Sequence, residues 1–224
     1  MLAVGYNFYE KSLATVQRGI ESVKSHVDYI FAIDGRYTDE YGVPLFPDSE
    51  PLSHEIVRNY LQNIPNVILV DLPATEIQKR QRYLDMCKQY DCEYLIILDG
   101  DEFVLPESDW QSFKHNLEQC KPDTNIYGIK YEYSYPQHHD ATNYPRLWFR
   151  PWEMEYFHAH CLFKNKITGR VQKSSSGVPC IEGIRMAGDD TLRNREYQLQ
   201  SFEYQTWLIE HEQEIREEYR EKEY

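Results

Sequence analysis

YLIILDGDEF, residues 94–103, joins a run of apolar side chains to three acidic residues within four positions. The apolar half predicts a buried β-strand. Two earlier runs also stop at an aspartate, YIFAID at Asp34 and NVILVD at Asp71. In open parallel sheets, ligands bind beyond the carboxyl ends of the strands, so we expect the three aspartates to meet at one edge and to mark the site. For Asp34 and Asp71, a helix N-cap or a turn position is the structural alternative.

The rest of the chain predicts an α/β fold. Residues 2–5 form a fourth apolar run, and segments with apolar residues at helical spacing separate the runs. This alternation predicts a mostly parallel sheet flanked by helices. Alternating segments at 126–135, 144–150 and 158–164 predict a small antiparallel addition. We expect one domain over 1–190, with halves at 1–105 and 106–190, and a C-terminal helical extension over 191–224.

Charge and composition exclude some classes of partner. The formal net charge of −13 argues against a nucleic acid, because phosphate backbones require a basic surface. An anionic ligand would need local cations or a metal to reverse the sign of the field. The N-terminus turns polar too early for a signal peptide, and no apolar run approaches the ~18 residues of a membrane span. The sequence therefore predicts a cytoplasmic protein without a transmembrane segment.

The acidic cluster predicts a metal site. Three carboxylates in four residues repel one another unless a cation lies among them. Alternation puts Asp99 and Asp101 on one side, and Gly100 leaves room for a ligand near the backbone. Hard oxygen ligands suit Mg²⁺ or Mn²⁺, which also bind diphosphates. A calcium-binding loop requires a glycine where the chain has Val104, which argues against that class.

A basic cluster precedes the same strand. Lys79, Arg80 and Arg82 stand together in an otherwise acidic protein, and one face of their predicted helix could reach a diphosphate. The alternative is an ordinary solvated helix face, with Glu76 and Arg80 paired at i, i+4.

Three stretches carry a resemblance to a known family: GYNFYEKSLATVQRGIESV from Gly5, FAIDGRYTDE from Phe31, and KRQRYLDMCKQYDCEYLIILDGDEF from Lys79. The chain resembles a GT-A glycosyltransferase, close to family 2 and its relatives with a D-x-D-E-F signature. This resemblance implies the Rossmann-like GT-A fold and a nucleotide-sugar donor. It covers about the first 105 residues well and the remainder loosely. Some donor-binding residues follow from this resemblance, and others come from the strand ends and the basic cluster. Together they are Asn7, Asp34, Asp71, Lys79, Arg82, Asp99 and Gly100.

The second half is expected to supply the catalytic base and a further metal ligand. GDDTLRNREY, from Gly188, is similar to the E-D-x-x-L-x-x-R pattern of inverting family members, which points to Asp190 as the base and to Asp189 beside it. A helix N-cap is the alternative for both. Glu153 and Glu155 are the reserve candidates. GT-A enzymes often use a later histidine on the metal, and His160 is the candidate here, although such a histidine is also common in structural or acceptor-pocket roles.

The sequence thus predicts a metal-dependent glycosyltransferase that uses Mn²⁺ or Mg²⁺. It would move a sugar from a UDP- or GDP-sugar to a hydroxyl of a glycan, a lipid-linked acceptor or a small molecule, with inversion. Two alternatives stay open. A nucleotidyltransferase also places acidic metal ligands at strand ends, but its glycine-rich, lysine-containing loop is missing from GYNFYEK. A non-catalytic carbohydrate- or nucleotide-binding protein on the same fold is the other.

Overall fold

The computed structural model describes residues 1–8, 11–35, 37–38, 51–121, 124–132, 142–157, 159–173 and 178–188. Within these ranges, the side chains of 51–53, 142–144, 157, 159–162 and 172–173 are not described. Asp189, Asp190 and the expected helical extension over 191–224 lie outside the described residues.

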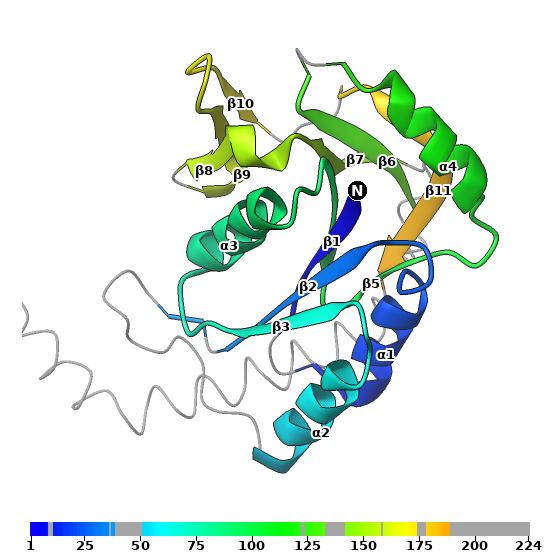
Figure 1. Ribbon diagram of the computed structural model, residues 1–224, viewed down its shortest axis with the longest axis vertical. Coiled ribbons are helices and arrows are strands. Elements are labelled where there is room, and N and C mark those ends of the chain that lie inside the picture. Colours follow the sequence, from blue (N-terminus) through cyan, green and yellow to red (C-terminus); the bar gives the residue numbers. More distant parts are fainter. Residues whose placement is uncertain are drawn as a thin grey trace, which may run out of the picture.

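Four parallel strands form the first half of the main sheet, in the order β3-β2-β1-β4 (Figure 1). They are β1 (Leu2–Asn7), β2 (Tyr29–Asp34), β3 (Val67–Asp71) and β4 (Tyr94–Asp99). The strands at the centre of this group are apolar on both faces, as parallel strands covered on both sides must be. The predicted α/β class with a mostly parallel sheet is therefore confirmed.

The second half of the chain extends this sheet to eight strands, in the order β3-β2-β1-β4-β7-β6-β11-β5. The added strands are β5 (Glu102–Val104), β6 (Ile126–Glu132), β7 (Thr142–Phe149) and β11 (Cys180–Gly188). β7 pairs antiparallel with both β4 and β6, as predicted, whereas β11 runs parallel to β6. A separate antiparallel sheet contains β8 (Met154–Phe157), β9 (Ala159–Asn165) and β10 (Val171–Lys173).

The main sheet curls back on itself at its far edge. Only Gly100 and Asp101 separate β4 from β5, yet β5 lies at the end of the strand order, beyond β11. The amide of Val104 in β5 donates to Ser22 Oγ at 3.0 Å, which fixes β5 beside the end of the first helix. Because Gly188 pairs with Glu102, the carboxyl end of β11 is brought to the turn after β4.

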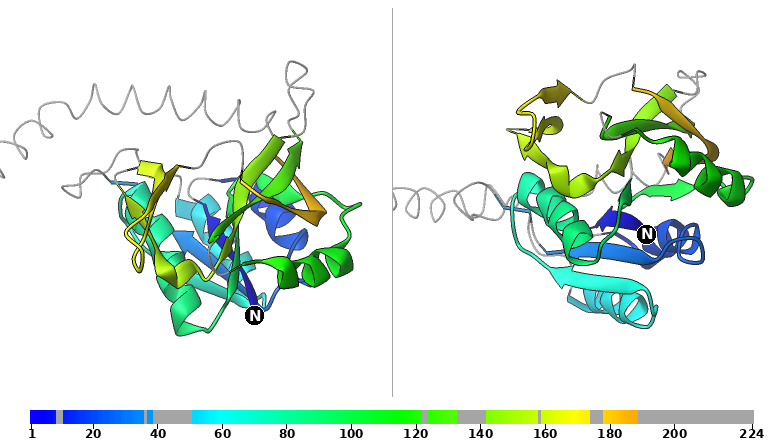
Figure 2. Two further views of the ribbon diagram at one scale, coloured as in Figure 1. Left: turned by 90° about the horizontal axis from the view of Figure 1, so that it is seen from above. Right: turned by 45° about the horizontal axis from the view of Figure 1, so that its top comes forward.

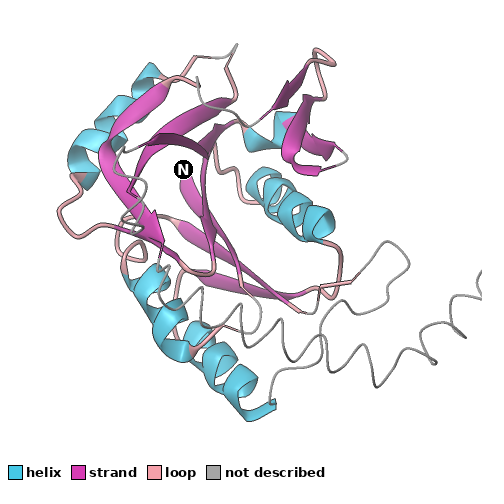
Figure 3. Cartoon of the chain, turned by 180° about the vertical axis from the view of Figure 1, so that it is seen from behind, coloured by secondary structure: helices cyan, strands magenta, loops and turns pink. Residues whose placement is uncertain are grey.

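Helices cover both faces of the sheet (Figure 2). On one face, residues such as Val4 and Ile96 pack with α1, α2 and α4, while on the other Ala3 and Leu95 pack with α3 and the small sheet. Figure 3 shows α3 on the side of the strands away from α1 and α2. The helices are α1 (Leu13–Glu21), α2 (Pro51–Gln62), α3 (Glu76–Gln89) and α4 (Trp110–Asn116), with short 3-10 turns η1 (Leu117–Gln119) and η2 (Pro151–Glu153).

The start of α3 is fixed by local chemistry. Thr75 Oγ1 accepts the amide of Gln78 at 3.2 Å, and Gln78 Oε1 accepts the amide of Thr75 at 3.0 Å. This capping box satisfies two amides that the first turn leaves unpaired. It begins the helix directly after the loop that follows β3, and the helix then packs on the sheet face that contains Ala3 and Leu95.

Gly35, which follows β2, is required by the fold. It has φ +105°, and a Cβ there would lie 2.6 Å from the carbonyl carbon of Leu72. Gly35→Ala should therefore lower the free energy of unfolding by about 1–3 kcal/mol more than Gly169→Ala does. Gly169 is the matched control, because it also has a positive φ (+70°) but a Cβ there would meet nothing within 4 Å. Urea unfolding of both variants measures the difference, and equal losses would contradict the packing argument.

Candidate functional site

The ends of the four parallel strands bring polar side chains to one edge. β1, β2, β3 and β4 finish at Asn7, Asp34, Asp71 and Asp99. The strand register pairs Asn7 with Asp99 and Asp34 with Asp71. Asp34 and Asp71 therefore end neighbouring strands, and Asp99 is separated from them by Asn7 of β1, at the edge where ligands of parallel sheets bind.

Asp34 and Asp71 are tied to α2. Asp34 is wholly buried, and His54 Nε2 lies 2.7 Å from its Oδ2. Arg58 Nη1 bridges the two aspartates, at 3.1 Å from Asp34 and 3.0 Å from Asp71. The side chain of Asp71 is 53% exposed, so this ion pair forms the outer rim of the edge. His54 and Arg58 lie at i and i+4 on the helix, which lets both side chains reach the same strand ends.

Lys79 brings a buried cation under the same edge. Its Nζ donates to the carbonyl of Gly35 and lies 4.1 Å from the centre of the Tyr37 ring. Burial lowers the pKa of Lys79 to about 8, and the nearby carboxylates of Asp34 and Asp71 oppose that shift.

Asp99 is held by two arginines from distant parts of the chain. Arg80 Nη2 donates to Asp99 Oδ1 at 2.7 Å, and Arg146 Nη2 donates to Asp99 Oδ2 at 2.8 Å. Burial alone would raise the pKa of Asp99, but Arg146 and Arg80 hold it well below its ordinary value. Asp99 therefore stays ionised and joins α3 to β7.

Glu102 closes this network from β5. Its carboxylate accepts from Arg146 Nη2 and, at 2.9 Å, from the amide of Asp99. Burial, with a further contribution from the negative charge of Asp99, raises the pKa of Glu102 to about 7, although Arg146 opposes the shift. The four side chains Arg80, Asp99, Arg146 and Glu102 are called the arginine–carboxylate network below.

Asn7 leaves a buried hydrogen-bond acceptor at the edge. Its Nδ2 donates to the hydroxyl of Tyr37 at 2.8 Å, whereas its Oδ1 is buried and has no hydrogen-bond partner among the described residues. A buried acceptor without a partner costs about 1–3 kcal/mol, so this oxygen is suited to an N–H or O–H group from a ligand.

The space beside Gly100 is occupied by the chain itself. A Cβ at Gly100 would lie 3.0 Å from Lys11 Cγ and 3.2 Å from the carbonyl oxygen of Asn7. The hydroxyl of Tyr6 donates to the Gly100 carbonyl at 2.8 Å. The missing side chain of Gly100 thus makes room for Lys11 and for the backbone of Asn7. Lys11 therefore lies beside the acidic turn.

The two aspartates of the turn fit a divalent metal ion differently. Asp101 is buried, with 8% exposure, and offers the hard carboxylate oxygens that Mg²⁺ and Mn²⁺ prefer. Each oxygen of Asp99 already accepts from a guanidinium group, so its fit is poor. In the described part of the chain, no three His, Cys, Asp or Glu side chains are grouped to hold a metal. The side chain of His160, the expected third ligand, lies outside the described residues.

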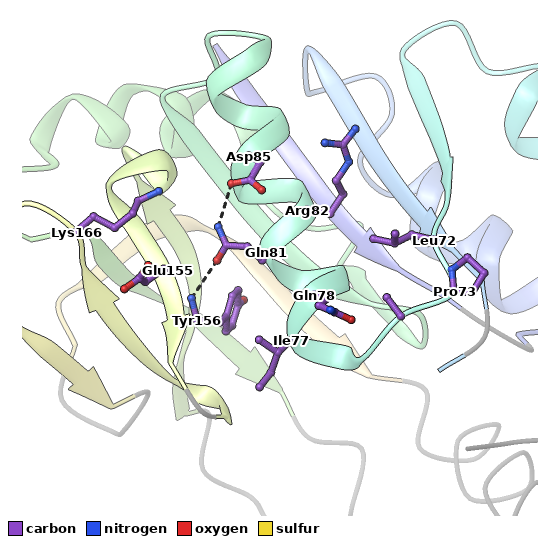
Figure 4. Close-up of a pocket in the computed structure, with 11 residues that line it drawn as sticks. Leu72, Pro73, Ile77, Gln78, Gln81, Arg82, Asp85, Glu155, Tyr156 and Lys166 are labelled. Atoms are coloured by element: carbon purple, nitrogen blue, oxygen red, sulfur yellow. Dashed lines mark hydrogen bonds between the residues drawn. The ribbon is translucent and has the colours of Figure 1, made fainter. Parts of the chain in front are cut away.

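Arg82 and Glu155 lie in a groove of about 710 Å³ on the outer side of α3 (Figure 4). Residues two apart on a helix do not share a face, so Arg82 points away from the face that presents Arg80 to Asp99. Glu155 Oε1 lies 3.4 Å from Lys164 Nζ, while its strand neighbour Tyr156 faces the buried Tyr83. The structure therefore does not bring Arg82 or Glu155 together with the arginine–carboxylate network.

Glu153, Asp189 and Asp190 are the remaining base candidates. Glu153 accepts from Asn125 Nδ2 at 3.2 Å, in the turn between β7 and β8. Asp189 and Asp190 are not described, but the described chain ends at Gly188, opposite Glu102 in the strand register.

Sequence reasoning missed Arg146, His54 and Arg58 as parts of the site, and it counted Glu102 in the acidic cluster without predicting its contact with Arg146. Arg146 carried a usable signal, because it is a single charge directly before the apolar residues Leu147–Phe149 of a strand, and a buried charge requires a partner. The i, i+4 spacing of His54 and Arg58 is too common on solvated helix faces to have identified them.

Comparison with known proteins gives partial structural likenesses only. No protein-family model matches the chain, and no curated protein matches it. A crystal structure of S. aureus TarS 1–349 is similar, with TM-score 0.45 and 13% identity, over 66% of this chain and 47% of that one. The same TarS fragment in complex with UDP-GlcNAc gives TM-score 0.43 and 13% identity, over 67% and 45%. GalNAc-T7 with UDP, GalNAc and Mn²⁺ gives TM-score 0.43 and 17% identity, over 59% and 23%.

The chain thus spans less than half the length of each of these three structures. With TM-scores below 0.5, nothing about the activity of this chain follows from these likenesses. In the described part of the chain, no helix has the length and apolar character needed to cross a bilayer.

The shifted pKa of Lys79 predicts a pH dependence of stability. The folded protein releases this proton near pH 8, whereas the unfolded chain holds it up to about 10.5. Unfolding therefore takes up a proton between these values, and stability rises with pH across the window. Relative to Lys79→Met, the wild-type free energy of unfolding should increase by up to about 3 kcal/mol from pH 8 to 10.5. Urea unfolding of both proteins at each pH measures this difference, and parallel curves would contradict it.

Proposed function

We propose that this protein is a glycosyltransferase that binds a nucleoside-diphosphate sugar at the carboxyl edge of β1–β4 and transfers the sugar to a hydroxyl acceptor. The observation that carries the proposal is the buried Oδ1 of Asn7, which has no hydrogen-bond partner among the described residues. Asn7 lies opposite Asp99 in the strand register, next to the arginine–carboxylate network. A nucleotide base or a sugar hydroxyl supplies the N–H or O–H that this acceptor lacks. A ligand that carries both hydrogen-bond donors and a diphosphate matches the edge, because the donors can bind Asn7 Oδ1 and the diphosphate can bind the arginines of the network.

The charge distribution supports an anionic ligand at this edge. The protein carries a net charge of −13, yet positive side chains gather around the strand ends. They are Lys11, Arg58, Lys79, Arg80 and Arg146. Several of them are buried, and charges in a low-dielectric region act more strongly than the same charges in water. Arg58, Arg80 and Arg146 are paired with carboxylates of the same edge, so the edge is close to neutral and repels an anion less than the rest of this acidic protein does.

The proposed reaction is a displacement at the anomeric carbon of the donor sugar. The acceptor oxygen forms a bond to this carbon, the bond to the diphosphate oxygen breaks, and the diphosphate leaves with the electron pair. A carboxylate takes the proton of the acceptor hydroxyl. We assign this role to Asp190, with Asp189 beside it, because the described chain ends at Gly188 opposite Glu102. A single displacement of this kind inverts the anomeric configuration.

The divalent cation is assigned to Asp101 and His160, and Mn²⁺ or Mg²⁺ suits these ligands. When bound, the cation would stabilise the negative charge that develops on the leaving diphosphate. The acceptor is a glycan, a lipid-linked sugar or a small molecule, and the donor carries UDP or GDP.

Nucleotide binding tests the proposal directly. Thermal unfolding of the full chain with UDP, GDP and their sugar derivatives, with and without Mn²⁺, should show a rise in Tm for one base. Asn7→Ala should reduce this rise strongly and leave the unliganded Tm within a few degrees, because only one described hydrogen bond is lost. Release of nucleoside diphosphate supports the transferase, whereas binding without release supports a non-catalytic binding protein. No rise with any nucleotide would exclude both.

The base assignment predicts a difference between two carboxylates. Asp190→Asn should lower kcat by about 10²–10⁴-fold and leave the donor Kd unchanged, because the proton acceptor is lost but the donor site is intact. Glu155→Gln should have a small effect, since Glu155 faces Lys164 in the α3 groove. Steady-state kinetics with a donor found in the melting experiment measures both. A large loss of kcat in Glu155→Gln, without one in Asp190→Asn, would identify Glu155 as the base and contradict the assignment of Asp190.

A further inference from the structure

We propose that Asp99 is a positioning residue that holds Arg80 and Arg146 ready to bind the donor's diphosphate, while Asp101 is the metal carboxylate. The two aspartates of the Asp-Gly-Asp turn then have different tasks. This inference rests on the proposed function, because it assigns the groups that bind the diphosphate within the same site.

The geometry of Asp99 is that of an anchor. Arg80 from α3 and Arg146 from β7 each donate to a different oxygen of its carboxylate, at 2.7 and 2.8 Å. Each arginine side chain is 10% exposed, whereas that of Asp99 is 29% exposed. The two guanidinium groups are therefore largely buried, and they are held on either oxygen of a carboxylate that itself reaches solvent.

Both arginines are fixed before any ligand arrives. Arg80 Nε donates to Glu76 at 2.9 Å and its Nη1 donates to the Tyr83 hydroxyl at 3.4 Å. Arg146 is held in addition by Glu102. A preorganised guanidinium loses little conformational entropy when it binds an anion.

Arg80 keeps donor capacity for a ligand. A guanidinium carries five N–H groups, and the bonds from Arg80 to Glu76, Tyr83 and Asp99 use one on each nitrogen. Among the described residues, this leaves one N–H on each terminal nitrogen. Such a pair matches two oxygens of a phosphate group, which arginine binds in a bidentate manner.

A metal ion on Asp99 would conflict with this arrangement. A divalent cation bound to either carboxylate oxygen would lie a few ångströms from two guanidinium charges, and like charges at that distance repel each other. The two guanidinium groups together already carry two positive charges. Asp101, on the far side of Gly100, is the carboxylate of the turn to which the metal is assigned.

Isothermal titration of the full chain tests the division of tasks. The probes are UDP, GDP, uridine, guanosine and inorganic pyrophosphate, each in EDTA and in Mn²⁺, and electron paramagnetic resonance measures Mn²⁺ affinity separately. Asp99→Asn and Arg80→Gln should weaken binding of the recognised nucleoside diphosphate by about tenfold or more and leave binding of the nucleoside unchanged. Both should bind Mn²⁺ as the wild type does, whereas Asp101→Asn should lose Mn²⁺ affinity.

The controls separate a positioning role from a general structural one. Arg80→Lys keeps the charge without the planar fork and should restore part of the diphosphate affinity. Lys88→Gln, in the last turn of the same helix, should bind as the wild type does. If Asp99→Asn does not fold, as judged by its melting curve, Arg80→Gln and Arg80→Lys carry the test.

Failure of this inference is distinct from failure of the proposed function. A wild-type chain that binds neither UDP nor GDP contradicts the proposed function itself. A wild-type chain that binds one of them overturns the present inference if Asp99→Asn loses Mn²⁺ affinity as Asp101→Asn does. It is also overturned if Arg80→Gln leaves the ratio of diphosphate to nucleoside affinity unchanged.

Discussion

The two ion pairs that Asp99 forms with Arg80 and Arg146 are the interactions on which the arrangement of the site depends. They join the end of β4 to α3 through Arg80 and to β7 through Arg146, which lie 19 and 47 residues from Asp99 in the sequence. Removing one partner of a buried ion pair costs about 3–5 kcal/mol, because the other charge stays buried alone. Here Asp99 is the carboxylate that both cations share, while Glu76 pairs in addition with Arg80 and Glu102 with Arg146. The geometry of the edge and the packing of α3 against the sheet are therefore coupled through the same side chain.

An acidic protein can build an edge for an anion only by concentrating its cations there. In this structure the cations are buried and paired with carboxylates at the strand ends, which keeps them in place without a ligand. Burying a cation disfavours its charged form, and for Lys79 burial lowers the pKa to about 8. The pairing also means that the edge is close to neutral before binding. A ligand with a diphosphate then requires further positive charge, which is the part assigned to the cation on Asp101.

The sequence predicts the scaffold of the site better than its contacts. Apolar runs that stop at aspartates were sufficient to place β2, β3 and β4, because strand burial is a local property of the chain. The partners of Asp99 were not predictable in this way, since Arg146 reaches it from a strand that pairs only in the folded sheet. β11 was missed because Gly183, at φ +120°, interrupts its pattern. On α2, Ile56 is exposed while its neighbour Val57 is buried, so apolar residues at helical spacing do not by themselves show which of them face the sheet.

Glu102 connects the two halves of the chain at the point where the proposed chemistry takes place. Its carboxylate accepts from Arg146 and from the amide of Asp99, while its backbone pairs with Gly188 at the end of β11. A buried glutamate in this position would be costly without these partners, and burial raises its pKa to about 7 even with them. Burying this carboxylate has a structural benefit, because the same residue aligns the acidic turn with β11, the strand that leads to Asp189 and Asp190. Glu102 therefore has a structural role in this chain. It sets where the second half of the chain meets the first.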